Sequence, residues 1–322
     1  MSAIGAATRA PGKFADPDVT GTGEPRARVA LKRLETLWFN TGTLCNITCR
    51  NCYIESSPVN DALAYMARDD IAPFLDEAKR LGTREIGFTG GEPFMNPDIL
   101  AMLEDAITMG FEVLVLTNAM TPMQRPRIQA GLIDLNRRFR ARLCLRVSLD
   151  HYAQVFHEEE RGAATWAPAV EGLDWLVAQG FRIAIAGRTC WHETETEAHE
   201  GYARLIAQRG WPIDAADRAQ LTLFPEMAAH DVPEITTRCW SILDKSPDDM
   251  MCATSRMVVK RKGADAPVVL PCTLLPYGAA FEMGASLAEA AHADGGMFAE
   301  GAVKLCHRHC AEFCVLGGGS CS

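Results

Sequence analysis

Three cysteines near the start of the chain, Cys45, Cys49 and Cys52, form a C-x3-C-x2-C pattern. On a helix the three thiols would share one buried face, but the asparagine and threonine residues between them are poor helix formers, so we expect a loop. A structural zinc ion takes four protein ligands, and no histidine follows before position 151. An iron–sulfur cube held by only three thiolates keeps one iron open, which can bind a substrate or cofactor. The missing fourth ligand therefore favours an iron–sulfur cluster with an open iron.

Small and polar residues that suit a binding loop follow later apolar runs of the sequence. The stretch Thr89-Gly90-Gly91-Glu92-Pro93 follows one such run, and its glycines leave the backbone open to a ligand. Asn118 follows the next run, and Ser148 and Asp150 end the one after it. Such residues also make ordinary turns and caps, so each of them alone indicates little. Their order behind successive runs indicates a site at the carboxyl ends of neighbouring strands.

The cysteine pattern and the Gly-Gly-Glu-Pro stretch, in this order and each after a strand-like run, resemble the radical S-adenosylmethionine (SAM) superfamily. The resemblance covers about residues 34–226. It implies a [4Fe–4S] cluster on the three cysteines, with the open iron chelated by the amino and carboxylate groups of SAM. It further implies that one electron from the cluster cleaves SAM, and that the resulting 5′-deoxyadenosyl radical abstracts a hydrogen atom from the substrate. Many members carry an aromatic residue before the third cysteine, where this chain has Asn51.

The resemblance also implies which residues outside the cysteine loop contact SAM. They are Gly90, Gly91, Glu92, Asn118, Ser148, Asp150 and Arg188. Glu92 would accept a hydrogen bond from the methionyl ammonium or orient the loop. Arg188 ends the fifth strand-like run, where it would either pair with the methionyl carboxylate or lie on the surface as a solvated arginine.

A second group of cysteines lies in the last part of the chain, where seven of the twelve cysteines follow residue 238. Two cysteines around a hairpin-like stretch, followed by a C-x3-C-x3-C-x6-C tail, resemble the SPASM domain of this superfamily or its shortened twitch form. The full SPASM pattern ends in C-x2-C-x5-C-x3-C, so the departure favours a single auxiliary [4Fe–4S] cluster. The expected ligands are Cys252, Cys272, Cys310 and Cys314, with Cys321 next and Cys306, which could equally be a buried thiol, after it.

These residues need a scaffold that brings strand ends together. Apolar runs rich in Val, Ile, Leu or Phe predict strands at residues 36–40, 85–89, 112–117, 143–149, 182–188 and 220–224. Helical patterns lie between them at residues 70–81, 97–109, 125–138, 167–179 and 195–209. The alternation predicts an α/β fold with a parallel sheet, for which an open doubly wound sheet and a barrel are both possible. The resemblance implies a partial (β/α)6, TIM-like barrel.

The chain divides into three segments in this interpretation. Residues 1–28 are rich in Gly, Pro, Ala and Asp and are expected to be disordered. Residues 29–237 are expected to form the radical SAM partial barrel. Residues 238–322 are expected to form a small, cysteine-rich, metal-stapled domain of the SPASM or twitch type.

Composition excludes several classes of protein. The 322 residues are 48% hydrophobic and 23% charged, as in ordinary globular proteins, and the net charge of −9 argues against nucleic-acid binding. No apolar run is long enough to span a membrane, and the N-terminus lacks the apolar core of a signal peptide. We therefore expect a cytoplasmic protein without membrane contact, in which the cysteines bind metal and do not form disulfides.

The substrate is the least defined part of the interpretation. The segment before the barrel is too short and polar for a peptide-recognition domain, which favours a small molecule, such as a sugar or aminoglycoside-like alcohol, or a peptide presented by another protein. We expect oxidation or maturation of that substrate, with a flavodoxin- or ferredoxin-type electron donor. One alternative is a redox-neutral epimerase in which Cys190 returns the hydrogen atom. The other is a non-enzymatic iron–sulfur carrier or sensor, which would need no SAM-type motifs.

Overall fold

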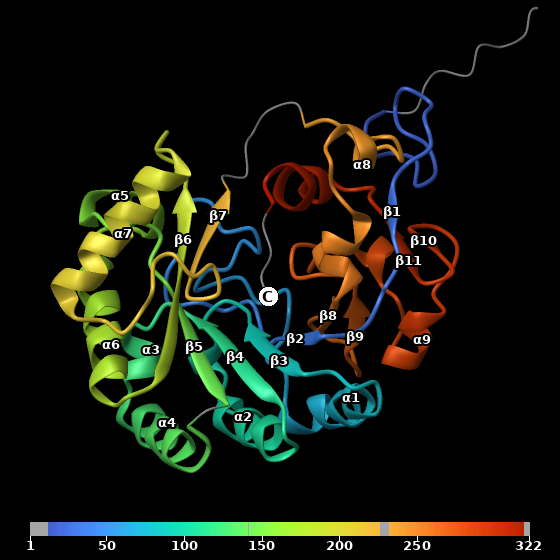
Figure 1. Cartoon of the computed structure of the whole chain (residues 1–322). Coiled ribbons are helices and arrows are strands. Elements are labelled where there is room, and N and C mark those ends of the chain that lie inside the picture. The colour runs from blue at the N-terminus through green and yellow to red at the C-terminus, as the bar shows by residue number, and fades with distance from the viewer. Residues whose placement is uncertain (1–11, 141, 226–231, 319–322) are drawn as a thin grey trace, which may run out of the picture.

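A curved eight-stranded sheet forms the centre of the molecule in the computed structural model, which describes residues 12–140, 142–225 and 232–318 (Figure 1). The strand order is β7-β6-β5-β4-β3-β2-β8-β9. The strands are β2 (Thr36–Asn40), β3 (Glu85–Thr89), β4 (Glu112–Thr117), β5 (Leu143–Ser148), β6 (Arg182–Thr189), β7 (Leu221–Pro225), β8 (Ser255–Val259) and β9 (Val268–Leu270). Strands β2 to β7 are parallel and follow chain order, so their carboxyl ends share one edge of the sheet. The expected α/β fold with a partial (β/α)6 barrel is confirmed.

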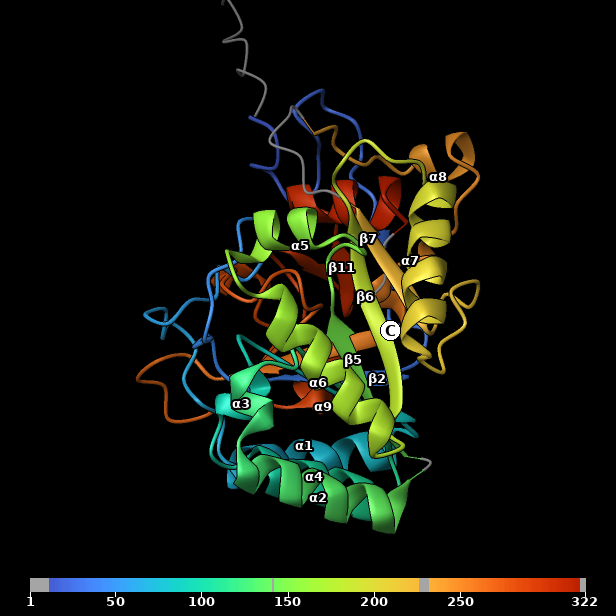
Figure 2. The same cartoon turned by 90° about the vertical axis from the view of Figure 1, so that its left-hand side faces the viewer.

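Helices connect the parallel strands and cover the outer face of the sheet. They are α1 (Arg68–Arg80), α2 (Ile99–Thr108), α3 (Thr121–Gln124), α4 (Pro126–Phe139), α5 (Gln154–Arg161), α6 (Trp166–Ala178) and α7 (Glu195–Arg209). Helices α1, α2 and α4 lie side by side below the sheet, and α6 lies in front of the strands when the molecule is turned (Figures 1 and 2). Within the described part of the chain, we find no helix with both the length and the apolar character needed to cross a membrane.

The local sequence explains where these elements pack and end. Strand β2 is buried along its whole length, as expected for a central parallel strand, and Gly87 of β3 lies against the Trp38 ring where any side chain would collide. Thr194 caps the N-terminus of helix α7 and forms a reciprocal capping box with Glu197. Gly210 caps its C-terminus, where the left-handed φ of +66° favours glycine.

The C-terminal part of the chain continues the barrel sheet before it forms its own structure. Strand β8 pairs in parallel with β2, and β9 returns antiparallel to β8. Besides three short 3-10 helices (Pro247–Asp249, Met251–Ala253 and Ala279–Phe281), the other described elements are α8 (Cys239–Ile242), α9 (Leu287–Ala291), β10 (Phe298–Ala299), β11 (Ala302–Lys304) and a π-helix at Cys310–Leu316. The predicted boundary near residue 238 stays a prediction, because the described contacts join the two parts through β8.

The expectation of disorder up to residue 28 is wrong for residues 12–28. Strand β1 (Arg28–Val29) pairs with β11, and β11 also pairs with β10. The three strands form a small antiparallel sheet with β11 in the middle (Figure 1). Arg26 is buried and forms an ion pair of 2.5 Å with Glu234. These partners lie far along the chain, so the polar composition of the segment gives no sign of them.

Candidate active site

A pocket opens at the carboxyl ends of the parallel strands and collects most of the residues that the motifs indicate. All three cysteines of the C-x3-C-x2-C loop line it. Six of the seven predicted SAM contacts line it as well, namely Gly90, Gly91, Asn118, Ser148, Asp150 and Arg188. The parallel sheet explains this convergence, because these residues follow or end the strands β2 to β6, and all these strands end at one edge. Glu92 is the predicted contact that does not line the pocket.

The cysteine loop holds its thiols in a partly buried wall of the pocket. Burial raises the pKa of Cys45 to about 12 and that of Cys49 to about 11. Both are therefore neutral thiols near pH 7 unless a metal replaces their protons. Across the described residues, no three His, Cys, Asp or Glu side chains form a group suited to a metal ion. A four-iron cube needs less convergence than a single zinc ion, because each thiolate binds a different iron, so the donor set fits a cluster better.

The Gly-Gly-Glu-Pro stretch packs directly against the backbone that leads into the cysteine loop. The Gly91 N–H donates to the Gly42 carbonyl at 2.9 Å, and the Glu92 N–H donates to the Leu44 carbonyl at 3.2 Å. A Cβ atom on Gly91 would lie 2.2 Å from the Leu44 carbonyl oxygen. The two loops are thus joined along their backbones. Only glycine fits at position 91, because the Leu44 backbone lies too close for a side chain.

Replacing Gly91 by alanine is therefore expected to displace the cysteine loop. Overpacking of this kind typically lowers the free energy of unfolding by ~1–3 kcal/mol, and here the moved atoms are backbone. Iron content per chain and the unfolding midpoint measure the two effects. Gly263→Ala is a suitable control, because a Cβ there meets no atom within 4 Å. Its positive φ (+79°), which Gly91 does not have, adds a backbone cost of its own, but the substitution leaves the cysteine loop alone. Equal iron loss in both variants would contradict the proposed packing role.

The carboxylate of Glu92 forms hydrogen bonds with other groups of the protein. The side chain is 1% exposed and accepts from the backbone N–H groups of Phe94 and Asn118 at 3.1 and 2.8 Å. It also accepts from the Thr117 hydroxyl at 2.9 Å. Burial raises the pKa of Glu92 to about 7. Of the two roles predicted for Glu92, these contacts support loop orientation, since they tie the β3 loop to the end of β4.

Asp150 anchors a buried charge network in the pocket wall. Its carboxylate accepts two hydrogen bonds from Arg161, at 2.7 and 3.2 Å, and Arg188 Nε lies 3.6 Å away. Burial acts to raise the pKa of Asp150, but Arg161 and Arg188 outweigh it and hold the pKa below its usual value. Arg188 also donates to the Asn51 carbonyl in the cysteine loop at 3.1 Å. Arg188 is therefore a largely enclosed pocket residue, with its side chain 11% exposed, and not a solvated surface arginine.

Arg161 is a pocket residue that sequence reasoning missed. It lies on α5, which was not predicted, and it lines the same pocket as the cysteines. The helix buries His157 and Glu160 on its inner face, so the usual apolar periodicity is absent. Its only sequence signal is a run of charged residues, which more often marks a solvated surface.

Asn118 places a polar group near the thiols, whereas Cys190 lies in a neighbouring cavity. Asn118 Nδ2 donates to Asn46 Oδ1 at 2.9 Å and lies 3.9 Å from Cys45 Sγ. Polar groups that contact metal ligands orient those ligands and change the properties of the bound metal. Cys190 instead lines a separate neighbouring cavity, together with Trp191 and Glu159. Its role as a hydrogen donor stays a prediction without a pocket contact to support it.

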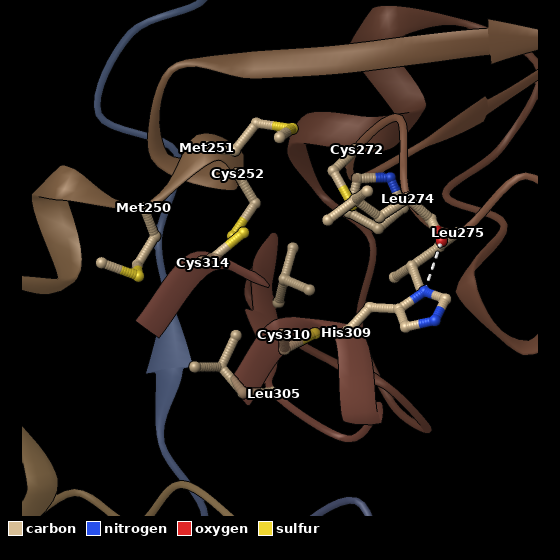
Figure 3. A pocket seen from close by; sticks show the side chains of 12 residues that line it. Met250, Met251, Cys252, Cys272, Leu274, Leu275, Leu305, His309, Cys310 and Cys314 are labelled. Atoms are coloured by element: carbon tan, nitrogen blue, oxygen red, sulfur yellow. Dashed lines mark hydrogen bonds between the residues drawn. The ribbon is translucent and has the colours of Figure 1, made fainter. Parts of the chain in front are cut away.

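A second pocket in the C-terminal region brings together four cysteines (Figure 3). Cys252, Cys272, Cys310 and Cys314 point their side chains toward one space, which is otherwise lined mainly by Met and Leu. Burial raises the pKa of Cys252 to about 11. The π-helix supplies Cys310 and Cys314, and such wide helical turns often occur at functional sites. These are the four cysteines expected to bind the auxiliary cluster.

The other C-terminal cysteines lie apart from this pocket or beyond the described residues. Cys306 is buried, and its thiol donates to the carbonyls of Phe14 and Asp16 at 3.3 and 3.4 Å. Cys239 Sγ accepts from the Thr236 N–H at 3.4 Å. Cys321 lies outside the described residues, so its predicted ligand role stays a prediction. Cys306 packs the N-terminal segment and takes no part in the pocket.

Tyr277 links the two sites. Its hydroxyl donates to the carbonyl of Ile54, a residue that lines the first pocket, and accepts from Asn60 Nδ2 at 3.0 Å. The same short segment carries Leu275, which lines the second pocket. The segment between the cysteine pair and the tail therefore supports the cysteine loop of the barrel.

Replacing Tyr277 by phenylalanine keeps the ring and removes both hydrogen bonds. Each bond contributes ~0.5–1.5 kcal/mol, so we expect a small loss of stability and a several-fold faster loss of iron from the first site. We would measure iron loss to a chelator in protein that also carries Cys310→Ala. That protein should lack the auxiliary cluster, so the assay follows the first site alone. Tyr202→Phe, which removes one bond to the Leu149 carbonyl, is the control and should leave iron release unchanged. Equal release rates in the Tyr277 variant and its parent would refute the supporting role.

Comparison with known proteins gives a family match over the barrel. Residues 39–206 match the family model described as the Radical SAM superfamily. The antilisterial bacteriocin subtilosin biosynthesis protein AlbA of Bacillus subtilis is 27% identical over 143 residues, which cover 44% of this chain and 30% of AlbA. A GTP 3′,8-cyclase of Pseudomonas fluorescens is 24% identical over 154 residues, 47% of this chain and 43% of the cyclase. The chain thus spans less than half of these curated relatives.

Solved structures with the same fold include Streptococcus suis SuiB. Its complex with S-adenosylmethionine has a TM-score of 0.58 at 13% identity, over 82% of this chain and 66% of SuiB. Its complex with the precursor peptide SuiA has a TM-score of 0.56 at 15% identity, over 80% of this chain and 63% of SuiB. At this level of identity the likeness establishes the fold.

Proposed function

The chain belongs to the radical SAM superfamily, and from this premise we propose that it is an enzyme that cleaves SAM reductively in the pocket of Cys45, Cys49 and Cys52. One observation carries the proposal. The three thiols and six further motif residues, which are spread over 144 positions from Cys45 to Arg188 (188 − 45 + 1), line one pocket at the strand ends. A carrier or sensor would need the thiols alone.

The described residues fit a cluster and SAM together. Cys45, Cys49 and Cys52 would hold the [4Fe–4S] cluster, and the donor set leaves one iron without a protein thiolate. Gly90 and Gly91 keep the adjoining wall free of side chains, with Gly90 at a φ of +143°. When bound, the pair would supply a one-electron cleavage of SAM to methionine and a 5′-deoxyadenosyl radical, which becomes 5′-deoxyadenosine by taking a hydrogen atom from the substrate.

The chain's own residues bind, orient and balance charge in this proposal. Arg161 and Arg188 place cations beside the pocket, where they suit the methionyl carboxylate of SAM. Asp150 is already paired with Arg161, so it would act mainly by holding that arginine in place and less as a free acceptor for ribose hydroxyls. Ser148 would meet polar groups of SAM at the pocket wall, whereas Asn118 already bonds Asn46 and the Met120 N–H and would mainly orient the wall.

We further propose one auxiliary [4Fe–4S] cluster at Cys252, Cys272, Cys310 and Cys314. A complete set of four thiolates leaves no iron open, which favours electron transfer over substrate binding. The auxiliary cluster would then accept an electron from the substrate radical and give net oxidation. An external donor such as a flavodoxin or ferredoxin would supply the electron for SAM cleavage.

The substrate class that we propose is a peptide. Two similar proteins have names or titles that concern peptides, since AlbA serves biosynthesis of the bacteriocin subtilosin and SuiB was solved with its precursor peptide. Because GTP 3′,8-cyclases are also similar to this chain, a small-molecule substrate is the alternative. Peptide oxidation or maturation is therefore the finer proposal, and redox-neutral epimerisation through Cys190 is the second candidate reaction.

Anaerobic reconstitution tests the proposal. Wild-type protein should hold about eight irons per chain and form 5′-deoxyadenosine with reductant and SAM. The triple variant Cys45→Ala/Cys49→Ala/Cys52→Ala should keep about four irons and form none. Protein that holds its iron but forms no 5′-deoxyadenosine would support the carrier hypothesis instead.

With a candidate peptide, deuterium transfer from a labelled residue into 5′-deoxyadenosine would identify the substrate. Cys190→Ala would abolish turnover if the reaction is an epimerisation.

A further inference from the structure

Arg256 on β8 is a deeply buried cation, and no carboxylate of the described residues pairs with its hydrogen-bonding groups. Its side chain is among the largest that are fully buried, and the residue is 2% exposed. Nη1 donates to the carbonyls of Cys252 and Ser255, at 2.6 and 2.8 Å. Nε and Nη2 have no hydrogen-bond partner within the described ranges of the chain. The guanidinium thus bonds only to neutral carbonyl oxygens there.

A buried charge of this kind needs an opposite charge. The effective penalty for burying an uncompensated ion in a protein is several kcal/mol, and unpaired N–H groups add to it. Arg256 bonds the Cys252 carbonyl, and its guanidinium lies within electrostatic reach of the Cys252 and Cys272 side chains. Both cysteines line the second pocket. An anion at that pocket would therefore complete the environment of Arg256.

A four-iron cluster on four thiolates is such an anion. Its net charge is negative and becomes more negative when it takes an electron. Net charge and hydrogen bonds to the sulfurs are two of the factors that set the reduction potential of iron–sulfur clusters. A fixed buried cation next to the ligands stabilises the reduced form more than the oxidised form, because the attraction grows with the negative charge.

We propose that Arg256 is the built-in counter-charge of the auxiliary cluster and raises its reduction potential, so that the cluster accepts electrons more readily. The proposal rests on the proposed auxiliary cluster at Cys252, Cys272, Cys310 and Cys314. It gives that cluster a direction of electron flow, from substrate radical to cluster, which is the direction that net oxidation needs. Arg256 is in this account a positioning and tuning residue and does not touch the substrate.

A purely structural arginine would give different results. If Arg256 served only to bond the carbonyls of Cys252 and Ser255, its loss would destabilise the protein with and without the cluster by the same amount. If it is a counter-charge, its loss should destabilise the cluster-loaded protein only. The cluster-free protein should be unchanged or more stable, because an unpaired buried charge has been removed.

The test uses the Cys45→Ala/Cys49→Ala/Cys52→Ala protein, in which the auxiliary cluster gives the only iron–sulfur signal. An EPR-monitored redox titration compares this parent with Arg256→Met and Arg256→Lys. At a fixed potential, Arg256→Met should lower the ratio of reduced to oxidised cluster at least tenfold, which corresponds to ~59 mV for a one-electron couple. Arg256→Lys keeps the charge and should restore most of the ratio. Arg146→Met, which removes a buried arginine from β5, is the control and should leave the ratio unchanged.

The outcomes separate this inference from the proposal it rests on. A triple-cysteine parent that binds no iron would refute the auxiliary cluster, and the role of Arg256 with it. A parent with about four irons, but an Arg256→Met ratio within twofold of it, would refute the role of Arg256 alone. If Arg256→Met cannot hold the cluster, thermal unfolding of cluster-free protein decides. Stability equal to or above that of the parent supports the counter-charge, and lower stability overturns it.

Discussion

Protein with Cys49 replaced by alanine should form no 5′-deoxyadenosine above background, while it keeps about four irons per chain at the auxiliary site. The reason is that Cys45, Cys49 and Cys52 are the cysteines that line the first pocket, so no other cysteine there can replace a lost ligand. Iron and sulfide analysis together with a 5′-deoxyadenosine assay measures both effects in one preparation.

Two other cysteine variants complete this experiment. Cys310→Ala should show the reverse pattern, with auxiliary iron lost and SAM cleavage retained, because Cys310 lines the second pocket. Cys306→Ala should change neither, since that thiol bonds carbonyls of the N-terminal segment. If the Cys49 variant still produced 5′-deoxyadenosine at the wild-type rate, the assignment of the first site would be wrong.

Arg161→Met is expected to have the second largest effect. It leaves Asp150 buried without its bidentate partner, and breaking a buried pair in this way typically lowers the free energy of unfolding by ~3–5 kcal/mol. Arg188, 3.6 Å from the same carboxylate, should reduce this loss toward the lower end. The variant should also bind SAM much more weakly, because a pocket cation is lost. Chemical denaturation and SAM-binding titration measure the two consequences.

A double variant separates stability from binding in this network. Arg161→Met/Asp150→Asn removes both charges and should recover much of the stability, but it should not recover SAM binding. Arg50→Met removes an exposed partner of Glu159 and should cost only about 0–1 kcal/mol. Recovery of SAM binding in the double variant would show that Arg161 acts only through Asp150 and does not contact SAM.

The strands of the barrel could be predicted from the sequence because each is a short apolar run that the fold buries. The observed bounds of β2, β3 and β4 equal the predicted ones, those of β5 and β6 differ by one residue at the carboxyl end, and β7 is shifted by one residue. The motif residues could be placed for the same reason, since they directly follow those runs. Parallel pairing then brings them to one edge without further information.

What could not be predicted depends on contacts between distant parts of the chain. Helix α5 buries Glu160, which accepts from the backbone and side chain of Asn51 at 2.8 Å each, so its buried face is polar. Arg26 meets Glu234 across 208 positions of the chain, and local composition cannot indicate such a pair. The parallel pairing of β8 with β2 is equally remote, and it placed part of the expected second domain in the barrel sheet.

We propose that the cluster on Cys45, Cys49 and Cys52 binds SAM directly. The most direct test is the EPR spectrum of the reduced Cys252→Ala/Cys272→Ala protein, in which this cluster alone should remain, recorded with and without SAM. We expect SAM to change the g values of the signal, because a ligand would join the open iron. A spectrum that SAM leaves unchanged, in protein with about four irons per chain, would contradict the account.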